Sequence, residues 1–386
     1  MILAMTPRIL VISFSNIASD ARVLREISAV AKHGHVTTVG YGIKPSGAEE
    51  HLQISDDALS LPKTVPGIAK LALRRLDSVE LDAPGVQEAI KLIDDRTFDL
   101  VVANDARALP LAFAVRGDAP VWADMHEWAP EERTHIRAWR WFVAPLMDHV
   151  CKKYLPQAGA VSTVGAEIAK LYNERYGVTP RLVRNAAPFA DLTPSSMSDN
   201  GTIRLVHSGG ATFGRNIEAM IEAVKAAGDH ITLDLYLVPA NDGGAYLATL
   251  KDVAGDNPRI SFHDPVKPHE LPATLNPYDV GIFWIPPFNT NARLTLPNKI
   301  FDFVQGRLGV TVGPTIEMAR VIDEYKFGLV TSDFEQATIV EAIQSLTPDQ
   351  VVAWKQAAHA AAHELSFENE AKTIDEIVTS LLSSRH

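Results

Sequence analysis

Short apolar runs alternate with stretches of helical periodicity along the chain, and this series occurs twice. The first series has strand-like runs at 8–14, 35–41, 99–103, 120–124, 160–163 and 181–184, with helical patterns at 20–33, 84–95, 106–116, 133–154 and 165–176. The second has strand-like runs at 203–208, 232–238, 259–262, 279–284, 309–312 and 328–330. Such alternation predicts two doubly wound α/β units, each a parallel sheet covered by helices on both faces.

The two series are separated by a segment rich in turn residues and poor in periodicity. We predict an N-terminal Rossmann-like domain over 1–185, a linker over 186–201 and a second domain over 202–365. Open α/β sheets bind ligands beyond the carboxyl ends of their strands, so we expect a cleft between the two units. The stretch 44–82 fits this scheme least well and is predicted as a long excursion or an irregular helix pair.

Composition narrows the classes of partner. The 386 residues carry 36 Lys and Arg against 47 Asp and Glu, a net charge of −11, which argues against nucleic acid as the main partner. A single cysteine, Cys151, excludes an intrachain disulfide and a site with several cysteine ligands. The apolar start has Arg8 inside it and no cleavage signal, and no apolar run is long enough to span a membrane, so we expect a cytoplasmic protein.

The first candidate site opens the second series. A strand at 203–208 runs through Gly209 and Gly210 to Arg215 and Asn216, directly before an amphipathic helix. Glycines allow the backbone to approach a phosphate closely, the helix N-terminus favours an anion, and Arg215 adds a permanent charge. The alternative is an ordinary turn with Asn216 as the N-cap and Arg215 in solvent.

The second candidate site follows the strand at 279–284. Pro297 is expected to begin a helix that carries Asn298 and Asp302 on one face, with Lys299 in its first turn. A carboxylate here could accept hydrogen bonds from a ribose diol, and a lysine could bind phosphate. The alternative is an ordinary helix with a solvated lysine.

These segments resemble the donor-binding domain of retaining GT-B glycosyltransferases of the large family numbered four. The turn that ends at Arg215-Asn216 is similar to the family's Lys-Gly or Arg-Gly before a long helix. The segment LPNKIFDFVQGRLGVTVG at 296–313 is similar to the family's P-x-K-hydrophobic-x-E-Y-x-x-x-G-x-P-V-V.

The first half resembles the same family. Residues 20–26, followed by 34–37, resemble its opening D-x-R-V-x-R-E and G-H-x-V-T, and 124–127 resembles the D-x-H-E that ends its fourth strand. Counterparts also exist for 162–165 and for Asn185, so the likeness spans roughly residues 8 to 365. A helix from Ser366 to Leu382 would, in such proteins, cross back to the first domain, and we place this segment at 366–386.

The resemblance implies a role for each matching position. Arg215 and Lys299 would bind the donor diphosphate, and Asp302 would bind the donor ribose. His126 would contact the sugar or help to orient the acceptor. The expected catalytic residues are His126, Arg215 and Lys299. The implied donor-binding residues are Asn16, Gly209, Gly210, Arg215, Asn216, Asn298, Lys299 and Asp302. The residues expected on the acceptor side are Asp105, Asp124 and Glu127.

The sequence departs from the family pattern in the donor pocket. Leu294 stands where the family often has a first glutamate that contacts the sugar, and Arg293 beside it indicates a rebuilt pocket. Asp302-Phe303 replaces the usual Glu-Tyr, with a side chain one methylene shorter.

One predicted helix suggests a surface for a membrane. In 133–154, Arg133, Arg137 and Arg140 follow i, i+4, i+7 spacing, interleaved with Trp139, Trp141 and Phe142. Such a basic and aromatic face could contact the inner face of a membrane and present a lipid-linked acceptor. The alternative is a packed helix with a solvated face.

We hypothesise a retaining glycosyltransferase that moves a hexose-type sugar from a nucleoside diphosphate donor to a hydroxyl acceptor, in the manner of cell-envelope polysaccharide biosynthesis. Neither a metal nor another cofactor is expected, because Arg and Lys can supply the positive charge. A nucleotide-sugar 2-epimerase and a catalytically silent nucleotide-sugar binder remain alternatives. Base, sugar, acceptor and oligomeric state are left open.

Overall fold

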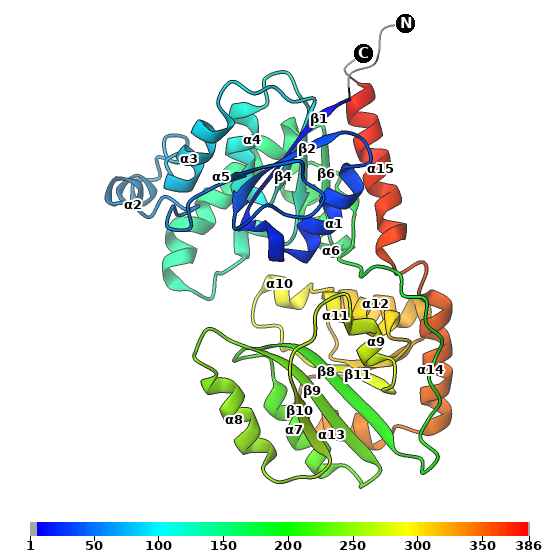
Figure 1. Ribbon diagram of the computed structural model, residues 1–386. Helices are drawn as coiled ribbons and strands as arrows, with labels where there is room; N and C mark the ends of the chain where they lie inside the picture. The colour runs from blue at the N-terminus through cyan, green and yellow to red at the C-terminus, as the bar shows by residue number, and fades with distance from the viewer. Residues whose placement is uncertain (1–5, 385–386) are drawn as a thin grey trace, which may run out of the picture. The chain divides into compact units, whose positions relative to one another are not determined.

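The computed structural model describes residues 6–384 and divides into two compact units (Figure 1). The first unit contains the chain up to Arg184, then Asn289–Asn291 and the chain from Glu370 onward. The second contains Asn185–Phe288 and Ala292–Asn369. Each unit is described by itself below.

The first unit is built on a seven-stranded parallel sheet with the order β3-β2-β1-β4-β5-β6-β7. Its strands are β1 (Arg8–Asn16), β2 (His35–Tyr41), β3 (Glu50–Gln53), β4 (Leu100–Asn104), β5 (Val121–Met125), β6 (Ala160–Thr163) and β7 (Arg181–Leu182). Helices lie on both sides of the sheet: α1 (Ala21–Val30), α2 (Val65–Ala72), α3 (Pro84–Ile93), α4 (Leu109–Val115), α5 (Ala144–Tyr154), α6 (Ala166–Tyr176) and α15 (Phe367–Ser383) (Figure 1). The central strands β4 and β5 are buried at every residue, as the continuous apolar runs predict.

The strand order of this sheet reverses between β1 and β4, which is where such sheets bind ligands. β1 ends at Asn16 and β4 at Asn104, directly before Asp105. β5 ends at Met125, and His126 follows it. The topology therefore gathers these polar residues at one edge of the sheet.

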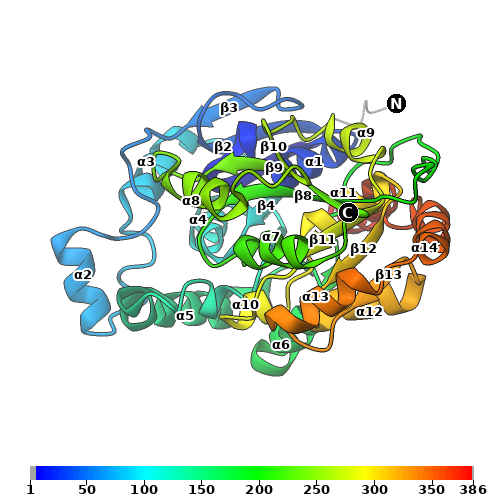
Figure 2. The ribbon, with the colours of Figure 1, turned by 90° about the horizontal axis from the view of Figure 1, so that it is seen from below.

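The poorly patterned stretch 44–82 contributes one strand and one helix. β3 extends the sheet beside β2, and α2 begins after Thr64, whose hydroxyl accepts a hydrogen bond from Gly67 N. Figures 1 and 2 both show α2 at the edge of the unit, and Figure 2 shows it beside the segment that leads into α5. The stretch is an excursion with one helix rather than a pair.

The predicted helix over 133–154 is wrong in its first turns. Residues 132–135 form a turn, the helix proper begins at 137, and 139–143 form a wide π turn. Pro145 has no N–H to donate to the Trp141 carbonyl four residues back, and Arg74 Nη1 donates to that oxygen instead, at 2.6 Å. Arg133 consequently does not lie on one helical stripe with Arg137 and Arg140.

The second unit has a six-stranded parallel sheet with the order β10-β9-β8-β11-β12-β13. Its strands are β8 (Ile203–Ala211), β9 (Ile231–Pro239), β10 (Ile260–His263), β11 (Val280–Phe283), β12 (Gly309–Val312) and β13 (Gly328–Val330). Its helices are α7 (Ile217–Ala226), α8 (Ala245–Ala254), α9 (Leu271–Leu275), α11 (Asn298–Gln305), α12 (Ile316–Tyr325), α13 (Gln336–Gln344) and α14 (Pro348–Ala361), with α10 (Thr290–Arg293) across the boundary of the units.

Each face of this second sheet carries its own apolar core. Leu205 on β8 packs into a cluster with residues of α7 and α13, whereas its neighbour Val206 packs into a second cluster with residues of α11, α12 and α14. Successive side chains of a strand point to opposite faces, so β8 is buried on both. The helix expected after Asn216 is α7, and its apolar face, Ile217, Met220, Ile221 and Val224, is fully buried in the first cluster.

The segment 186–201, predicted as a linker, has neither helix nor strand and packs on the second unit. Arg307 is fully buried and donates hydrogen bonds to the carbonyls of Ala190, at 2.6 Å, and Leu192, at 3.2 Å. Gln305 accepts one from Ala190 N at 3.0 Å. Two buried polar side chains thus fix this segment to its unit.

Candidate functional site

The two candidate segments of the second unit meet at Gly209 and Lys299. Gly209 is near the end of β8 with a φ of +133°, and a Cβ placed on it would lie 2.2 Å from Lys299 Nζ. Lys299 is the second residue of α11, and its ammonium also lies over the Phe283 ring, 5.5 Å from the centroid. The absence of a side chain at position 209 is therefore what makes room for the lysine.

Arg215 and Lys299 form a pair of neighbouring cations. Burial, reinforced by the charge of Arg215 and opposed by Asp302, lowers the pKa of Lys299 to about 8. Burial also lowers the pKa of Arg215. Within the described part of the chain, neither cation has an ion-pair partner within 4.0 Å. Partly buried cations without a carboxylate partner are costly unless an anion joins them, so this is an anion-binding arrangement.

His207 lies beside these cations without a charge of its own. Its Nδ1 bonds to the Ile282 carbonyl at 2.8 Å, which assigns the proton to Nδ1 and leaves Nε2 as an acceptor. Burial, followed by the charge of Lys299, lowers the pKa of His207 to about 3. Nε2 is buried and has no hydrogen-bond partner among the described residues.

The other residues predicted on the donor side are close in sequence to Arg215 or to Lys299. Asn216 has a left-handed backbone with a φ of 58° and does not cap α7 through its side chain, contrary to the ordinary-turn alternative. Asn298 is exposed at the start of α11, which Pro297 precedes as the N-cap residue, and Asp302 and Gly210 are half-buried. Leu294, in place of the family's first glutamate, is only 4% exposed.

The polar cluster of the first unit centres on Asp124. Arg22 on α1 donates to both of its carboxylate oxygens at 2.8 Å, and Ser162 Oγ donates to Oδ1 at 2.5 Å. Although burial opposes ionisation, Arg22 and His126 hold the pKa of Asp124 far below its usual range. Asp124 therefore stays ionised and fixes the position of α1 at the end of the sheet.

His126 lies between two carboxylates. Its Nδ1 is 3.3 Å from Asp105 Oδ2 and its Nε2 is 3.2 Å from Asp124 Oδ2, and Asn104 Oδ1 lies 2.9 Å from Nε2. Burial opposes the charged ring, but Asp105 and Asp124 outweigh it and raise the pKa of His126 to about 9. His126 is a cation at neutral pH, partnered by Asp105 and Asp124 rather than by Glu127.

Two acids near this histidine are held neutral. Burial, reinforced by repulsion from Asp124, raises the pKa of Glu26 to about 8, and its Oε1 accepts from Asn104 Nδ2 at 2.9 Å. Burial, reinforced by Glu132 and Asp105, raises the pKa of Glu127 to about 8 as well. Groups poised near neutral pH beside a cation are characteristic of functional sites.

Asn16 is exposed at the end of β1, and its side chain fills the space that a Cβ on Gly42 would occupy. Arg22 and Glu26 were not among the residues expected at the site, although both lie in the D-x-R-V-x-R-E segment. Their i, i+4 spacing on one helix face was the available signal. His207 and Phe283 gave no such signal, since only the sheet brings them to Lys299.

The structure contains one group of potential metal ligands within the described residues. Ligand atoms of Asp77, Glu80 and His149 lie within 4.8 Å of one another. Lys153 Nζ already donates to Asp77, at 3.1 Å, and to Glu80, at 2.6 Å, so an ammonium supplies the positive charge there. Between residues 6 and 384, no helix has the length and apolarity to cross a membrane.

Residues 21–192 match the model of Glycosyltransferase Family 4. No curated protein sequence matches the chain.

Solved structures share the fold along the whole chain. Sucrose-phosphate synthase from Thermosynechococcus elongatus superposes with a TM-score of 0.72 at 14% identity, covering 98% of this chain and 100% of that one. The α,α-trehalose 6-phosphate synthase of Burkholderia multivorans gives 0.69 at 12% identity, covering 99% and 100%. Anabaena HepE in complex with UDP and glucose gives 0.65 at 14% identity, covering 98% and 100%.

The fold and the family match define the class: the protein is a glycosyltransferase with the GT-B fold. The residues that match the Glycosyltransferase Family 4 model, 21–192, lie mostly in the first unit and extend into the start of the second.

Proposed function

We propose that the protein is a retaining glycosyltransferase that transfers a hexose-type sugar from a nucleoside diphosphate sugar to a hydroxyl acceptor. The observation that carries the proposal is the Arg215–Lys299 pair: Lys299 lies against Gly209, and among residues 6–384 neither cation has a carboxylate within 4.0 Å. Two linked phosphoryl groups provide the negative charge that such a pair lacks. The solved structure of HepE with UDP and glucose supports a uridine nucleotide as the first donor to test.

The cations would act where charge develops. As the glycosidic bond breaks, negative charge accumulates on the leaving diphosphate, and fixed positive groups stabilise it without reorganisation. In this proposal the leaving phosphate accepts the acceptor proton on the same face of the sugar. The cluster around His126 binds the sugar and acceptor hydroxyls, with Asp105 and Asp124 holding the imidazolium in place.

Arg215 and Lys299 together supply the charge that a divalent cation would provide in a metal-dependent transferase. We therefore propose that neither a metal nor another cofactor takes part. Turnover that persists at the same rate after treatment with EDTA would support this part of the proposal.

The test is calorimetric binding of UDP, GDP, ADP and their sugars. Arg215→Ala and Lys299→Ala should each weaken binding of the preferred nucleotide about 10- to 100-fold, the equivalent of one charge-assisted hydrogen bond. Lys225→Ala is the matched control, because Lys225 is a surface lysine of the same unit that pairs with Glu222. Unchanged affinity in both site variants would refute the donor site.

Product analysis separates the activities. NMR of the preferred sugar nucleotide incubated with the protein and candidate acceptors should show a glycoside with the donor's anomeric configuration. An isomerised sugar in the absence of acceptor would indicate a 2-epimerase, which the acids poised near neutrality around His126 would serve. Binding with no turnover would indicate a silent binder.

A further inference from the structure

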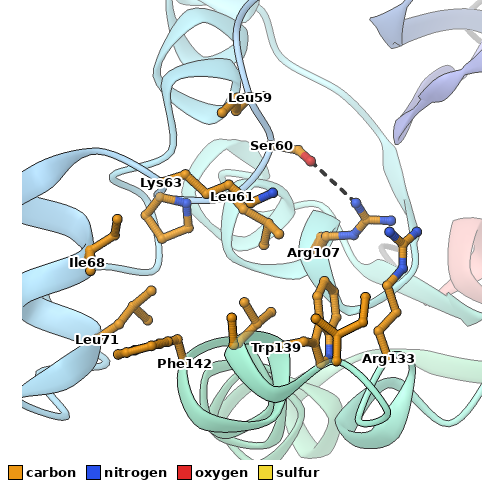
Figure 3. Close-up of a pocket in the computed structure, with 14 residues that line it drawn as sticks. Leu59, Ser60, Leu61, Lys63, Ile68, Leu71, Arg107, Arg133, Trp139 and Phe142 are labelled. Carbon is orange, nitrogen blue, oxygen red and sulfur yellow. Dashed lines mark hydrogen bonds between the residues drawn. The ribbon is translucent and has the colours of Figure 1, made fainter.

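The first unit contains a cavity that the proposed donor site does not involve. It lies between the segment 59–71, which includes α2, and the segment 133–143, which includes the π turn (Figure 3). Its volume is about 500 Å3, within the range of small-molecule sites. All of its lining residues belong to the first unit.

Most of the cavity wall is apolar. Leu61 and Leu71 from one segment face Trp139, Phe142 and Val143 from the other, and Figure 3 shows Leu71 and Phe142 at the end nearest α2. Trp139 and Leu71 are at least nine-tenths buried, so the wall is part of the fold rather than a loose surface. An apolar volume of this size suits an alkyl or isoprenoid chain.

The opposite end of the cavity is cationic. Arg107 and Arg133 both extend to it, and Lys63 also lines the cavity, whereas none of the fourteen lining residues is acidic (Figure 3). Arg107 has one side-chain hydrogen bond, to Ser60 Oγ at 3.3 Å. Arg133 pairs with Glu132 at 3.2 Å and lies over the Trp139 ring. Glu132 lies near both arginines and Glu127 near Arg133, but neither acid lines the cavity, and burial raises the pKa of both. The three cations that line the cavity therefore remain available to an anionic ligand group.

The surroundings of the cavity are unusually apolar for a protein surface. Ile68, Leu59 and Ile136 line it and are 46%, 48% and 45% exposed. Val65 on α2 and Trp141 on the π turn, close by in the chain, are 85% and 63% exposed. Exposed apolar side chains next to cations are typical of surfaces that accept amphiphiles.

We propose that this cavity binds a lipid phosphate, with its hydrocarbon chain between α2 and the π turn and its phosphate at Arg107 and Arg133. That this ligand is the acceptor, or carries it, rests on the proposed function. The binding of a lipid phosphate in the cavity does not. The sequence suggested a basic stripe along a helix over 133–154. In the structure, Arg133 lies in a turn and supplies a positive charge to this cavity instead.

The probe is n-decyl phosphate in solution below its micellar concentration, measured by calorimetry. We expect a one-to-one complex, with inorganic phosphate and n-decyl maltoside each binding at least tenfold more weakly. Equal binding of the maltoside would show a generic apolar site and would overturn the phosphate assignment. Absence of any complex would overturn the proposal as a whole.

Matched variants locate the complex. Ile68 lines the cavity, whereas Val65 lies on the same helix and does not line it, so Ile68→Asp is the test variant and Val65→Asp its control. Ile68→Asp and the double variant Arg107→Gln/Arg133→Gln should each weaken decyl phosphate binding at least tenfold, and Val65→Asp should not. A loss with Val65→Asp as large as with Ile68→Asp would indicate surface adsorption and would contradict the proposal.

Uridine nucleotide binding is measured on the same variants. It should be unchanged, because the Arg215–Lys299 pair lies in the other unit. Circular dichroism and thermal unfolding verify that the first unit of each variant is folded. If decyl phosphate binds while no nucleotide does, the donor proposal fails and the cavity proposal stands. If a nucleotide binds and decyl phosphate does not, only the cavity proposal is overturned.

Discussion

At the scale of single residues, the candidate site depends on charges held away from their ordinary pKa. Burial and Arg215 lower the pKa of Lys299 to about 8, whereas two carboxylates raise the pKa of His126 to about 9, so that it is a cation at neutral pH. The residue types were visible in the sequence, but these opposite shifts follow from burial and neighbours. The shifts of Lys299 and of Glu26 each have a consequence that can be measured.

The first concerns donor binding. Because the pKa of Lys299 is about 8 in the free protein, Lys299 loses its charge as the pH rises through that value. If only the charged form binds, the Kd for UDP should rise about tenfold between pH 7 and pH 9. Calorimetry at both pH values measures this, and Lys299→Arg should remove the dependence. A variant with the same pH dependence would assign it to another group.

The second concerns stability. The pKa of Glu26 is about 8 in the folded chain, against an ordinary value of 4.5, so the folded chain binds this proton more tightly. Stability therefore falls as the pH rises from about 4.5 to 8. Glu26→Gln keeps an acceptor for Asn104 and removes the cost. We expect it to be about 1–3 kcal/mol more stable at pH 7.5, with little difference near pH 4.5. Urea unfolding at the two pH values tests this, and a loss of stability at both would contradict it.

At the scale of elements, helix α1 links the first half's opening motif to its polar cluster. Asp20 caps α1 by accepting hydrogen bonds from Arg22 N and Val23 N, and the helix then presents Arg22 and Glu26 to Asp124 and Asn104. Asp20, the first residue of the motif, therefore fixes where α1 begins, and this places Arg22 and Glu26 at the polar cluster.

Removing that cap should loosen the helix. Asp20→Ala should reduce the free energy of unfolding by about 1 kcal/mol, while Asp20→Asn, an equally good cap, should remain close to the parent protein. Chemical denaturation of the three proteins measures the difference. Equal losses in both variants would show that the charge of Asp20, rather than its capping geometry, matters.

The segment 133–154 shows how an element can be misread. Periodicity predicted one helix over 133–154, but Pro145 has no N–H to donate to the Trp141 carbonyl, and residues 139–143 adopt a π turn. Which residue would satisfy that carbonyl could not be read from the segment itself, because its partner Arg74 lies 67 residues earlier. A proline inside an apparent helix was the local warning.

At the scale of the whole molecule, the first unit is completed by the last residues of the described chain. Glu370 accepts from Arg184 N, at 2.7 Å, and from Arg184 Nε, at 2.8 Å, and Asp375 lies 3.0 Å from His33 Nε2. The inner face of α15 is buried at Ile374, Ile377, Val378 and Leu381. The first unit cannot complete its core until the chain has passed through the second.

This dependence can be tested by one substitution. Val378→Asp places a charge at a position with no exposed surface and should destabilise the protein by about 3 kcal/mol or more. Thr379→Asp, one residue away and exposed, is the control and should have little effect. Thermal unfolding measures both. Equal stability of the two variants would mean that α15 is dispensable.

The sequence by itself determined the fold class, most of the strands and the two glycine- and lysine-bearing segments of the second unit. Strands buried on both faces and amphipathic helices leave a pattern in neighbouring residues, so local reading suffices for them. The tertiary structure decided which side chains meet: Lys299 with Gly209, His126 with Asp105 and Asp124, and Arg133 with the cavity. These meetings join residues far apart in the chain, and only the packing of the sheets fixes the distances on which their charges depend.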